Sequence, residues 1–238
     1  QNLEDTNDAL SANDYDFILG SLHCIKGEED FWKVDYEKND PFEFFDMYLD
    51  QLYELVRWNG FDSLAHLTYP LRYINGEHHF GVELKNYAEK VDEILKLLAK
   101  NQKALEINTS GYRQAYGKPL PDLEVVKRFK EVGGRYITFG SDAHHYYDVG
   151  KNIADGMEMA KAAGFTYLTN SMFPCSFPLS DWRITMDKLA KLLFKNARYS
   201  VADLAAMLGT TEEEVKEHIK KLEADGVING YKALINWE

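Results

Sequence analysis

The chain has 238 residues, of which 45% are hydrophobic and 28% are charged, and its formal net charge is -12. This composition can form a folded core and argues against general disorder, and the acidic balance disfavours non-specific binding to nucleic acid or anionic membranes. The two cysteines are too few for a thiolate zinc finger, and no apolar run reaches the ~18 residues that a membrane span requires. We therefore expect a cytoplasmic protein with reduced cysteines and no membrane partner.

Short apolar runs alternate with segments of helical periodicity along the first three quarters of the chain. The runs typical of buried strands are residues 15–20, 61–65, 104–108 and 136–140, with a weaker fifth at 165–169. Between these runs, apolar residues recur with helical spacing over residues 42–58, 84–99, 121–132 and 148–163. This alternation predicts an α/β fold.

The pattern changes after Pro178. Three helical segments follow, with no strand-like run before residues 227–228. The charge changes as well, because residues 183–238 hold nine basic and nine acidic side chains; the first 182 residues therefore carry 27 - 9 = 18 basic against 39 - 9 = 30 acidic ones. We predict one domain over residues 1–180 and a second over 181–238.

Polar side chains that can bind a metal ion follow the apolar runs directly. His23 follows the first run, His66 follows the second, Asn108 ends the third, and Asp142 and His144 follow the fourth. In a barrel or a parallel sheet flanked by helices, the carboxyl ends of the strands open on one face, so these groups would converge. Neutral imidazole with carboxylate is the ligand set of zinc, manganese or iron. A single histidine after a strand is more often structural, but three such strands favour metal or phosphate chemistry.

The same segments resemble the later motifs of the polymerase-and-histidinol-phosphatase (PHP) superfamily, and within it the histidinol-phosphatase branch. The matching segments are residues 14–23 (DYDFILGSLH), 64–66 (LAH), 105–111 (LEINTSG) and 139–144 (FGSDAH). The resemblance extends from residue 1 to about residue 175. It implies a distorted (β/α)7 barrel whose site holds up to three divalent metal ions, zinc, manganese or iron, that act on a phosphate monoester, here histidinol phosphate.

The resemblance also implies roles for individual residues. It assigns His23 and His66 to one metal ion, Asp142 to a second, and His144, which would also be catalytic, to a third.

Two further residues are implied to bind substrate. Arg72 resembles an arginine that grips the substrate phosphate, because a guanidinium fork matches a phosphate dianion; the alternative is a solvated charge at the start of a helix. Asn108 is assigned either to the substrate or to a supporting position behind the ligands.

The chain departs from the family pattern in its first part. The family's His-x-His, its acid-and-histidine pair and its bridging glutamate do not occur before Asp14. Zinc held by two imidazoles without a bridging carboxylate should bind weakly. We therefore expect an incomplete barrel that lacks its N-terminal strands, with fewer metal ions and an impaired hydrolase activity.

Residues 184–238 have the pattern of a small helical DNA-binding domain. Ser200 should cap a short helix, Gly209 supplies a tight turn, and Thr211 should cap a second helix whose first turn holds the glutamates 212–214. With a following hairpin this predicts a winged helix-turn-helix. The stretch resembles the N-terminal part of Lrp/AsnC-type regulators.

Four basic residues of this stretch are candidates for contacts to DNA phosphates: Arg198, Lys216, Lys220 and Lys221. The alternative is a solvated helix face with glutamate–lysine pairs. The three acids at the start of the second helix predict weak DNA binding. Two functions therefore remain open, a phosphate-monoester hydrolase of histidine biosynthesis and a DNA-binding transcriptional regulator with a non-catalytic PHP remnant.

Overall fold

The computed structural model describes residues 3–169, 176–178, 189, 192–193, 196–224 and 228. The chain forms two compact units, Gln1–Leu179 and Ser180–Glu238. Within the described ranges, no helix is long and apolar enough to cross a bilayer.

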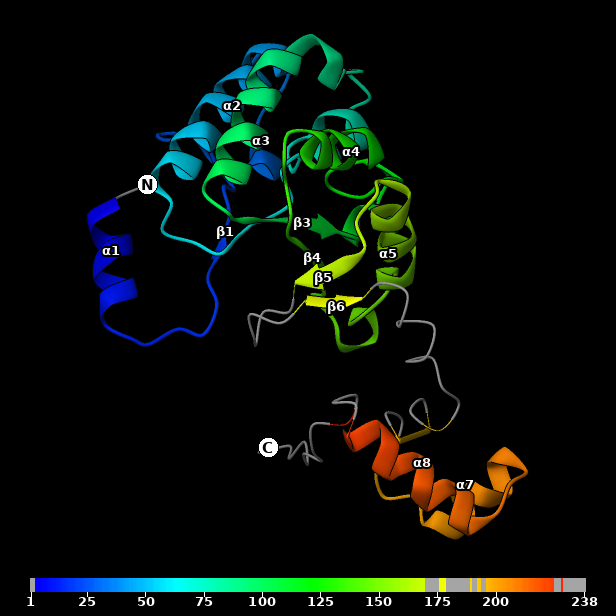
Figure 1. Ribbon diagram of the computed structural model, residues 1–238. Helices are drawn as coiled ribbons and strands as arrows, with labels where there is room; N and C mark the ends of the chain where they lie inside the picture. The colour runs from blue at the N-terminus through cyan, green and yellow to red at the C-terminus, as the bar shows by residue number, and fades with distance from the viewer. Residues whose placement is uncertain are drawn as a thin grey trace. The chain divides into compact units, whose positions relative to one another are not determined.

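The first unit is built on a four-stranded parallel sheet with the strand order β1-β2-β3-β4. Figure 1 labels β1, β3 and β4 of this sheet. Its strands are β1 (Leu19–Gly20), β2 (Ser63–Leu64), β3 (Ala104–Asn108) and β4 (Ile137–Gly140). Each strand pairs with the next one along the chain. This sequential parallel order is that of an arc of a (β/α) barrel, so the predicted α/β class is confirmed, with shorter strands than the apolar runs.

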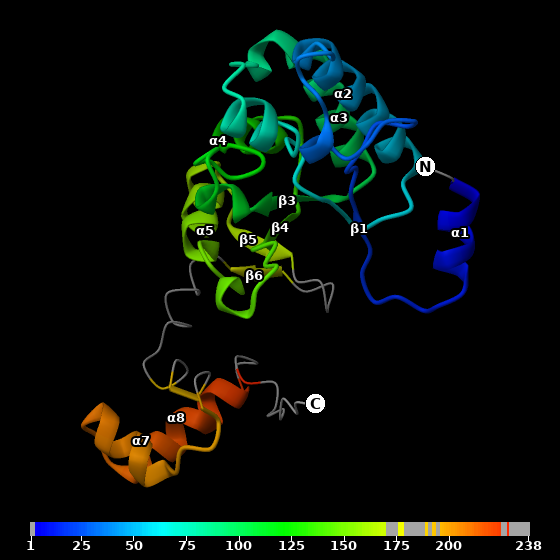
Figure 2. The same cartoon turned by 180° about the vertical axis from the view of Figure 1, so that it is seen from behind.

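Helices connect successive strands and cover one face of the sheet (Figures 1 and 2). These are α2 (Pro41–Trp58), α3 (Ala88–Lys100), α4 (Leu123–Glu131) and α5 (Ile153–Ala162). Each helix packs against the next in chain order, α3 also contacts β3, and α5 contacts β4. The core lies between these helices and the sheet, where Leu49, Leu52, Ile94 and Leu98 are fully buried.

Local capping explains where the helices begin. Asp40 caps α2 by accepting the backbone N–H of Phe42, at 2.8 Å. The predicted helix at residue 121 begins at Leu123, because Asp122 is its N-cap. The helix predicted from residue 148 begins at Ile153, because Asn152 has a left-handed backbone with φ 58° that a helix cannot include.

The two faces of the sheet differ in chemistry. Ile107 and Phe139 face α5, where they lie against the glycine position 156. Side chains alternate along a strand, so Glu106 and Thr138 project from the opposite, inner face. There the Ser63 and Thr138 hydroxyls are 2.7 Å apart. The inner face is therefore polar although it is buried.

The remaining elements of the first unit are short. Strand β5 (Tyr167–Thr169) lies at the predicted fifth run but pairs antiparallel with β6 (Ser176–Pro178), so it does not extend the parallel sheet. Helix α1 (Leu3–Ser11) was not predicted. The Trp58 indole N–H donates to Oδ1 of Asn7, a residue of this helix, at 3.1 Å. Short helical turns are η1 (Phe31–Lys33), η2 (Arg72–Glu77), η3 (Leu84–Tyr87), η4 (Ser110–Arg113) and η5 (Tyr146–Asp148).

The second unit contains the helix pair α7 (Val201–Leu208) and α8 (Glu212–Ala224). Ser200 and Asp203 form a capping box at α7, and Gly209 ends this helix with φ 68°, as predicted. The helices share a small apolar core that comprises Leu189, Leu204, Ala205, Val215 and Leu222. Most of the predicted first helix, the wing after α8 (apart from residue 228) and Cys175 lie outside the described residues.

Candidate active site

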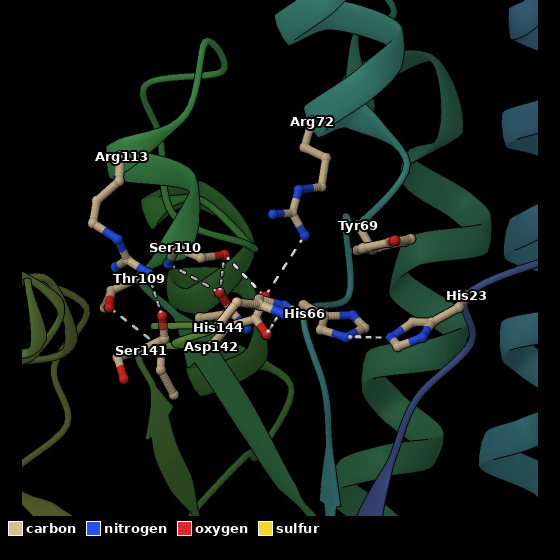
Figure 3. Close-up of polar contacts among 12 residues, drawn as sticks. His23, His66, Tyr69, Arg72, Thr109, Ser110, Arg113, Ser141, Asp142 and His144 are labelled. Atoms are coloured by element: carbon tan, nitrogen blue, oxygen red, sulfur yellow. Dashed lines mark hydrogen bonds and ion pairs between the residues drawn. The ribbon is translucent and has the colours of Figure 1, made fainter. Parts of the chain in front are cut away.

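Five of the predicted site residues converge at the carboxyl edge of the sheet (Figure 3). The Nε2 atoms of His23, after β1, and His66, after β2, are 3.1 Å apart. Arg72 Nη1 lies 3.6 Å from Asp142 Oδ2, and His144 Nε2 lies 3.6 Å from Asp142 Oδ1. Residues from three strand ends thus form one cluster, as the parallel topology requires.

Burial sets the protonation of the His66 imidazole. His66 is 6% exposed, and this burial, followed by the nearby His23, lowers the pKa of His66 to about 4. The His66 imidazole is therefore neutral at pH 7 and has a lone pair for a metal ion or a proton donor. Its Nδ1 atom is buried without a hydrogen-bond partner. The centre of the Tyr69 ring lies 4.9 Å from the centres of both the His23 and the His66 rings, so this ring lines one side of the imidazole pair.

The imidazole pair fits a divalent metal ion. Two neighbouring ligands of a tetrahedral zinc ion with Zn–N bonds of 2.0–2.1 Å are about 3.3 Å apart, close to the 3.1 Å between the Nε2 atoms of His23 and His66. Among the residues that the structure describes, no group of three or more histidines, cysteines, aspartates or glutamates could hold an ion. The donor set is thus two imidazoles, fewer than the three or four protein ligands usual for zinc.

Arg72 contributes a positive charge to the site. It begins η2, a π-helical turn of a kind frequent at functional sites. Its guanidinium carbon lies 5.3 Å from the centre of the Tyr69 ring and 5.5 Å from that of the Tyr73 ring, so the two rings flank the charge. The side chain is 12% exposed, and it points toward Asp142 rather than into solvent (Figure 3). This arrangement can present N–H donors to an anion.

Two of the site residues have a strained backbone. His66 has φ 26° and Asp142 has φ 47°, both in the left-handed region that residues other than glycine rarely adopt. Each such residue costs about 1–3 kcal/mol, and such residues gather at functional sites. The backbone N–H of His66 is held by Glu106 Oε2 at 2.8 Å.

Asn108 lies beneath the cluster rather than within it. The residue is 1% exposed, and its amide nitrogen donates to Glu106 Oε2 at 3.3 Å. Its amide oxygen accepts from the backbone N–H and the hydroxyl of Ser110, at 3.0 and 2.6 Å. Because both ends of the amide are engaged, this geometry favours the supporting role over a substrate contact.

Sequence reasoning missed two residues that contact the site. Glu106 was not nominated, although an acid inside the apolar run 104–108 was a usable signal. Burial raises the pKa of Glu106 to about 7. Arg113 donates from Nη2 to the carbonyl oxygen of Ser141, at 2.7 Å, and gave no sequence signal. Cys24, next to His23, is a half-buried free thiol.

The four candidate DNA-binding residues lie in the second unit and are all exposed. Arg198 precedes α7, whereas Lys216, Lys220 and Lys221 are on α8. Lys216 Nζ lies 4.0 Å from Glu212 Oε2, a loose surface pair.

Two family models match separate parts of the chain. Residues 3–110 match the family model of the PHP domain, and residues 183–229 match that of a winged helix-turn-helix DNA-binding domain.

Individual relatives are similar to the first part of the chain. The chain is 34% identical over 162 residues to a "Probable histidinol-phosphatase" of Thermotoga maritima, covering 68% of this chain and 62% of the relative. It is 33% identical over 158 residues to a "Probable histidinol-phosphatase" of Clostridium acetobutylicum, covering 63% and 60%. The chain thus spans about 60% of the length of these relatives.

A solved structure has a similar fold. It is the histidinol phosphate phosphatase of Lactococcus lactis subsp. lactis Il1403 in complex with zinc, L-histidinol and phosphate. The superposition has a TM-score of 0.58 with 24% sequence identity, and it covers 71% of this chain and 65% of the other. The first unit therefore has the α/β fold of this phosphatase.

Proposed function

We propose that the first unit is a metal-dependent phosphate-monoester hydrolase that acts on histidinol phosphate. The observation that carries this proposal is the convergence of the His23–His66 pair with Arg72 and Asp142 at one edge of the sheet. The names of the relatives and the zinc, L-histidinol and phosphate bound in the Lactococcus lactis structure support the choice of metal chemistry and substrate.

The proposed roles follow from the chemistry of each side chain. His23 and His66 would hold one divalent ion, zinc, manganese or iron, and Asp142 and His144 would contribute to further ions. A bound ion would polarise the phosphate and lower the pKa of a water molecule. Arg72 would pair its guanidinium fork with the phosphate oxygens. His144, whose side chain is 82% exposed, is accessible to a substrate and could pass a proton to the leaving oxygen.

The small number of protein ligands limits the expected activity. Two imidazoles hold zinc less firmly than the three or four ligands of ordinary zinc sites. We therefore expect weak metal affinity and slow turnover, which rises when zinc or manganese is added.

Phosphate release from histidinol phosphate, measured with and without added manganese or zinc, tests this function. We expect metal-dependent release that His66→Ala abolishes, because this substitution removes one of two ligands. His79→Asn is the matched control, since His79 is exposed and Asn tolerates its left-handed backbone, φ 58°. A rate that His66→Ala leaves unchanged would contradict the proposal.

We propose DNA binding as a second function, located in residues 181–238 and separate from a phosphatase domain in residues 1–180. The match of residues 183–229 and the α7–turn–α8 arrangement support it, and we assign the unit to the Lrp/AsnC type. A salt-dependent gel shift with mixed duplex DNA tests it. We expect weak binding at low salt that Lys220→Glu with Lys221→Glu removes, and no shift at any salt concentration would refute it. Both functions suit a cytoplasmic protein.

A further inference from the structure

We propose that three buried side chains, Glu106, Asn108 and Ser110, are positioning residues that hold His66 and Asp142 in place for the site chemistry. We call these three residues the β3 network, because they lie on β3 and directly after it. The inference rests on the proposed function, since it concerns how that site keeps its geometry.

The first link joins β3 to the residue that follows β2. Glu106 is 5% exposed, and its Oε2 accepts the backbone N–H of His66 at 2.8 Å. His66 has φ 26°, a conformation that persists only where surrounding contacts enforce it. The carboxyl group of Glu106 supplies such a contact at the strained residue itself.

The second link runs along β3 toward the residue that follows β4. Asn108 donates to Glu106 Oε2 at 3.3 Å and accepts from the Ser110 hydroxyl at 2.6 Å. The same hydroxyl lies 3.2 Å from Asp142 Oδ2, so its single proton serves two acceptors. His66 and Asp142, which follow different strands, are therefore joined through the side chains of the β3 network.

On the neighbouring strand β4, Gly140 leaves room for the Glu106 carboxyl group. A Cβ atom at Gly140 would stand 2.1 Å from Glu106 Oε1, so a side chain there would displace the carboxyl group. Arg113 donates to the carbonyl oxygen of Ser141 at 2.7 Å and so contacts the residue before Asp142.

The energetics favour a functional reason for the network. A buried carboxyl group costs stability relative to an apolar residue of similar volume. Glu106 lies on a strand whose residues are all buried, and the hydrogen bonds that it accepts from His66 and Asn108 offset this cost. Groups that orient metal ligands typically change metal affinity 10- to 100-fold when they are removed.

Two substitutions of Glu106 separate positioning from packing. Glu106→Gln retains an oxygen acceptor for the His66 N–H, whereas Glu106→Leu keeps the volume and removes the acceptor. The readout is zinc affinity of the purified full chain, measured by competition with a chromophoric chelator. We expect Glu106→Gln to stay within about threefold of the parent protein and Glu106→Leu to lose about 10- to 100-fold. Equal affinities for the parent and Glu106→Leu would overturn the inference.

A metal-free measurement keeps this test independent of the proposed function. Backbone amide ¹H–¹⁵N spectra in the presence of EDTA should show shifts at both His66 and Asp142 in Glu106→Leu, and much smaller shifts in Glu106→Gln. The milder Ser110→Ala should shift Asp142 if Glu106→Leu does not fold. Amide shifts without zinc binding by the parent protein would refute the metal function and leave the network standing, whereas zinc binding with an unmoved Asp142 amide would refute the network.

Discussion

His66 shows how its surroundings prepare a single side chain for chemistry. An ordinary histidine is partly protonated near neutral pH, but burial and the neighbouring His23 lower the pKa of His66 to about 4. A metal ion then does not compete with a proton for this imidazole above about pH 5. The same burial leaves Nδ1 without a partner, so the residue is held by its backbone and by its contact with His23.

Arg72 should bind phosphate through the shape of its guanidinium group and not through charge alone. Arg72→Met should lower the affinity for inorganic phosphate about 10- to 100-fold, because a hydrogen bond to a charged group is worth about 1.5–3 kcal/mol. The affinity is measured by calorimetry or as inhibition of phosphatase activity by phosphate. Arg72→Lys should restore only part of this, since an ammonium group cannot form the fork. Arg57→Met, on the exposed face of α2, is the control and should have no effect. Equal phosphate affinity in Arg72→Met would refute this role.

Gly140 should not tolerate a methyl group. In Gly140→Ala the new Cβ would overlap Glu106 Oε1, and we expect a loss of about 1–3 kcal/mol in the free energy of unfolding, together with weaker zinc binding. Gly81→Ala is the comparison, because nothing lies within 4 Å of its Cβ position and its cost of about 1 kcal/mol comes from φ 71° alone. Urea unfolding and chelator competition measure the two effects. Normal zinc affinity in Gly140→Ala would show that the carboxyl group can move without consequence.

At the scale of elements, contacts between consecutive helices stabilise the helical layer that covers the sheet. Arg128 on α4 pairs with Asp92 on α3 through both oxygens of the carboxylate, with Nε donating to Oδ1 at 2.7 Å. This pairing lies at the contact of two consecutive helices, so it stabilises their alignment.

The Asp92–Arg128 pair predicts a pH-dependent contribution to stability. Arg128 is the main cause that lowers the pKa of Asp92 to about 2, below the unfolded value of 3.8. The contribution is therefore complete above pH 3.8 and is lost as the pH falls through about 2. Because both side chains are partly exposed, we expect Asp92→Asn to cost only about 1 kcal/mol at pH 7, as measured by urea unfolding.

The control for Asp92→Asn is Glu131, a second acidic partner of Arg128. Glu131, whose side chain is 62% exposed, lies 3.0 Å from Arg128 Nη1. Glu131→Gln should change the free energy of unfolding by less than about 0.5 kcal/mol. An Asp92→Asn penalty that persists undiminished near pH 2 would refute the assignment to this ion pair.

At the scale of the whole molecule, the two units have separate cores. Leu204 of α7 is 1% exposed and belongs to the core of the second unit. Leu204→Ala should destabilise this unit by about 2–5 kcal/mol, while zinc affinity and phosphate release in the first unit stay within twofold of the parent protein. Urea unfolding together with chelator competition checks this. A parallel loss of zinc affinity would show that the site depends on both units.

Elements with strong periodicity were predictable from sequence, and their exact limits were not. The helix over residues 42–58 matches α2 almost residue for residue, because its apolar stripe, its cap at Asp40 and Pro41 agree. The helix predicted from residue 148 begins at Ile153, since the left-handed Asn152 gives no periodic signal. The fifth run formed a strand, but periodicity does not reveal the partner, and β5 joined a separate antiparallel pair.

The sequence by itself determined the α/β class, the strand-helix alternation and the identity of the polar groups at the strand ends, because these follow from local spacing and from the position of each group in the chain. Only the tertiary structure decided that Glu106 supports His66, that Asn108 lies beneath the site and that Arg72 turns inward between two tyrosines. The first outcome depends on a contact between residues 40 positions apart, which arises when parallel strands set their ends side by side. The other two depend on local side-chain contacts whose direction the spacing of residues does not reveal.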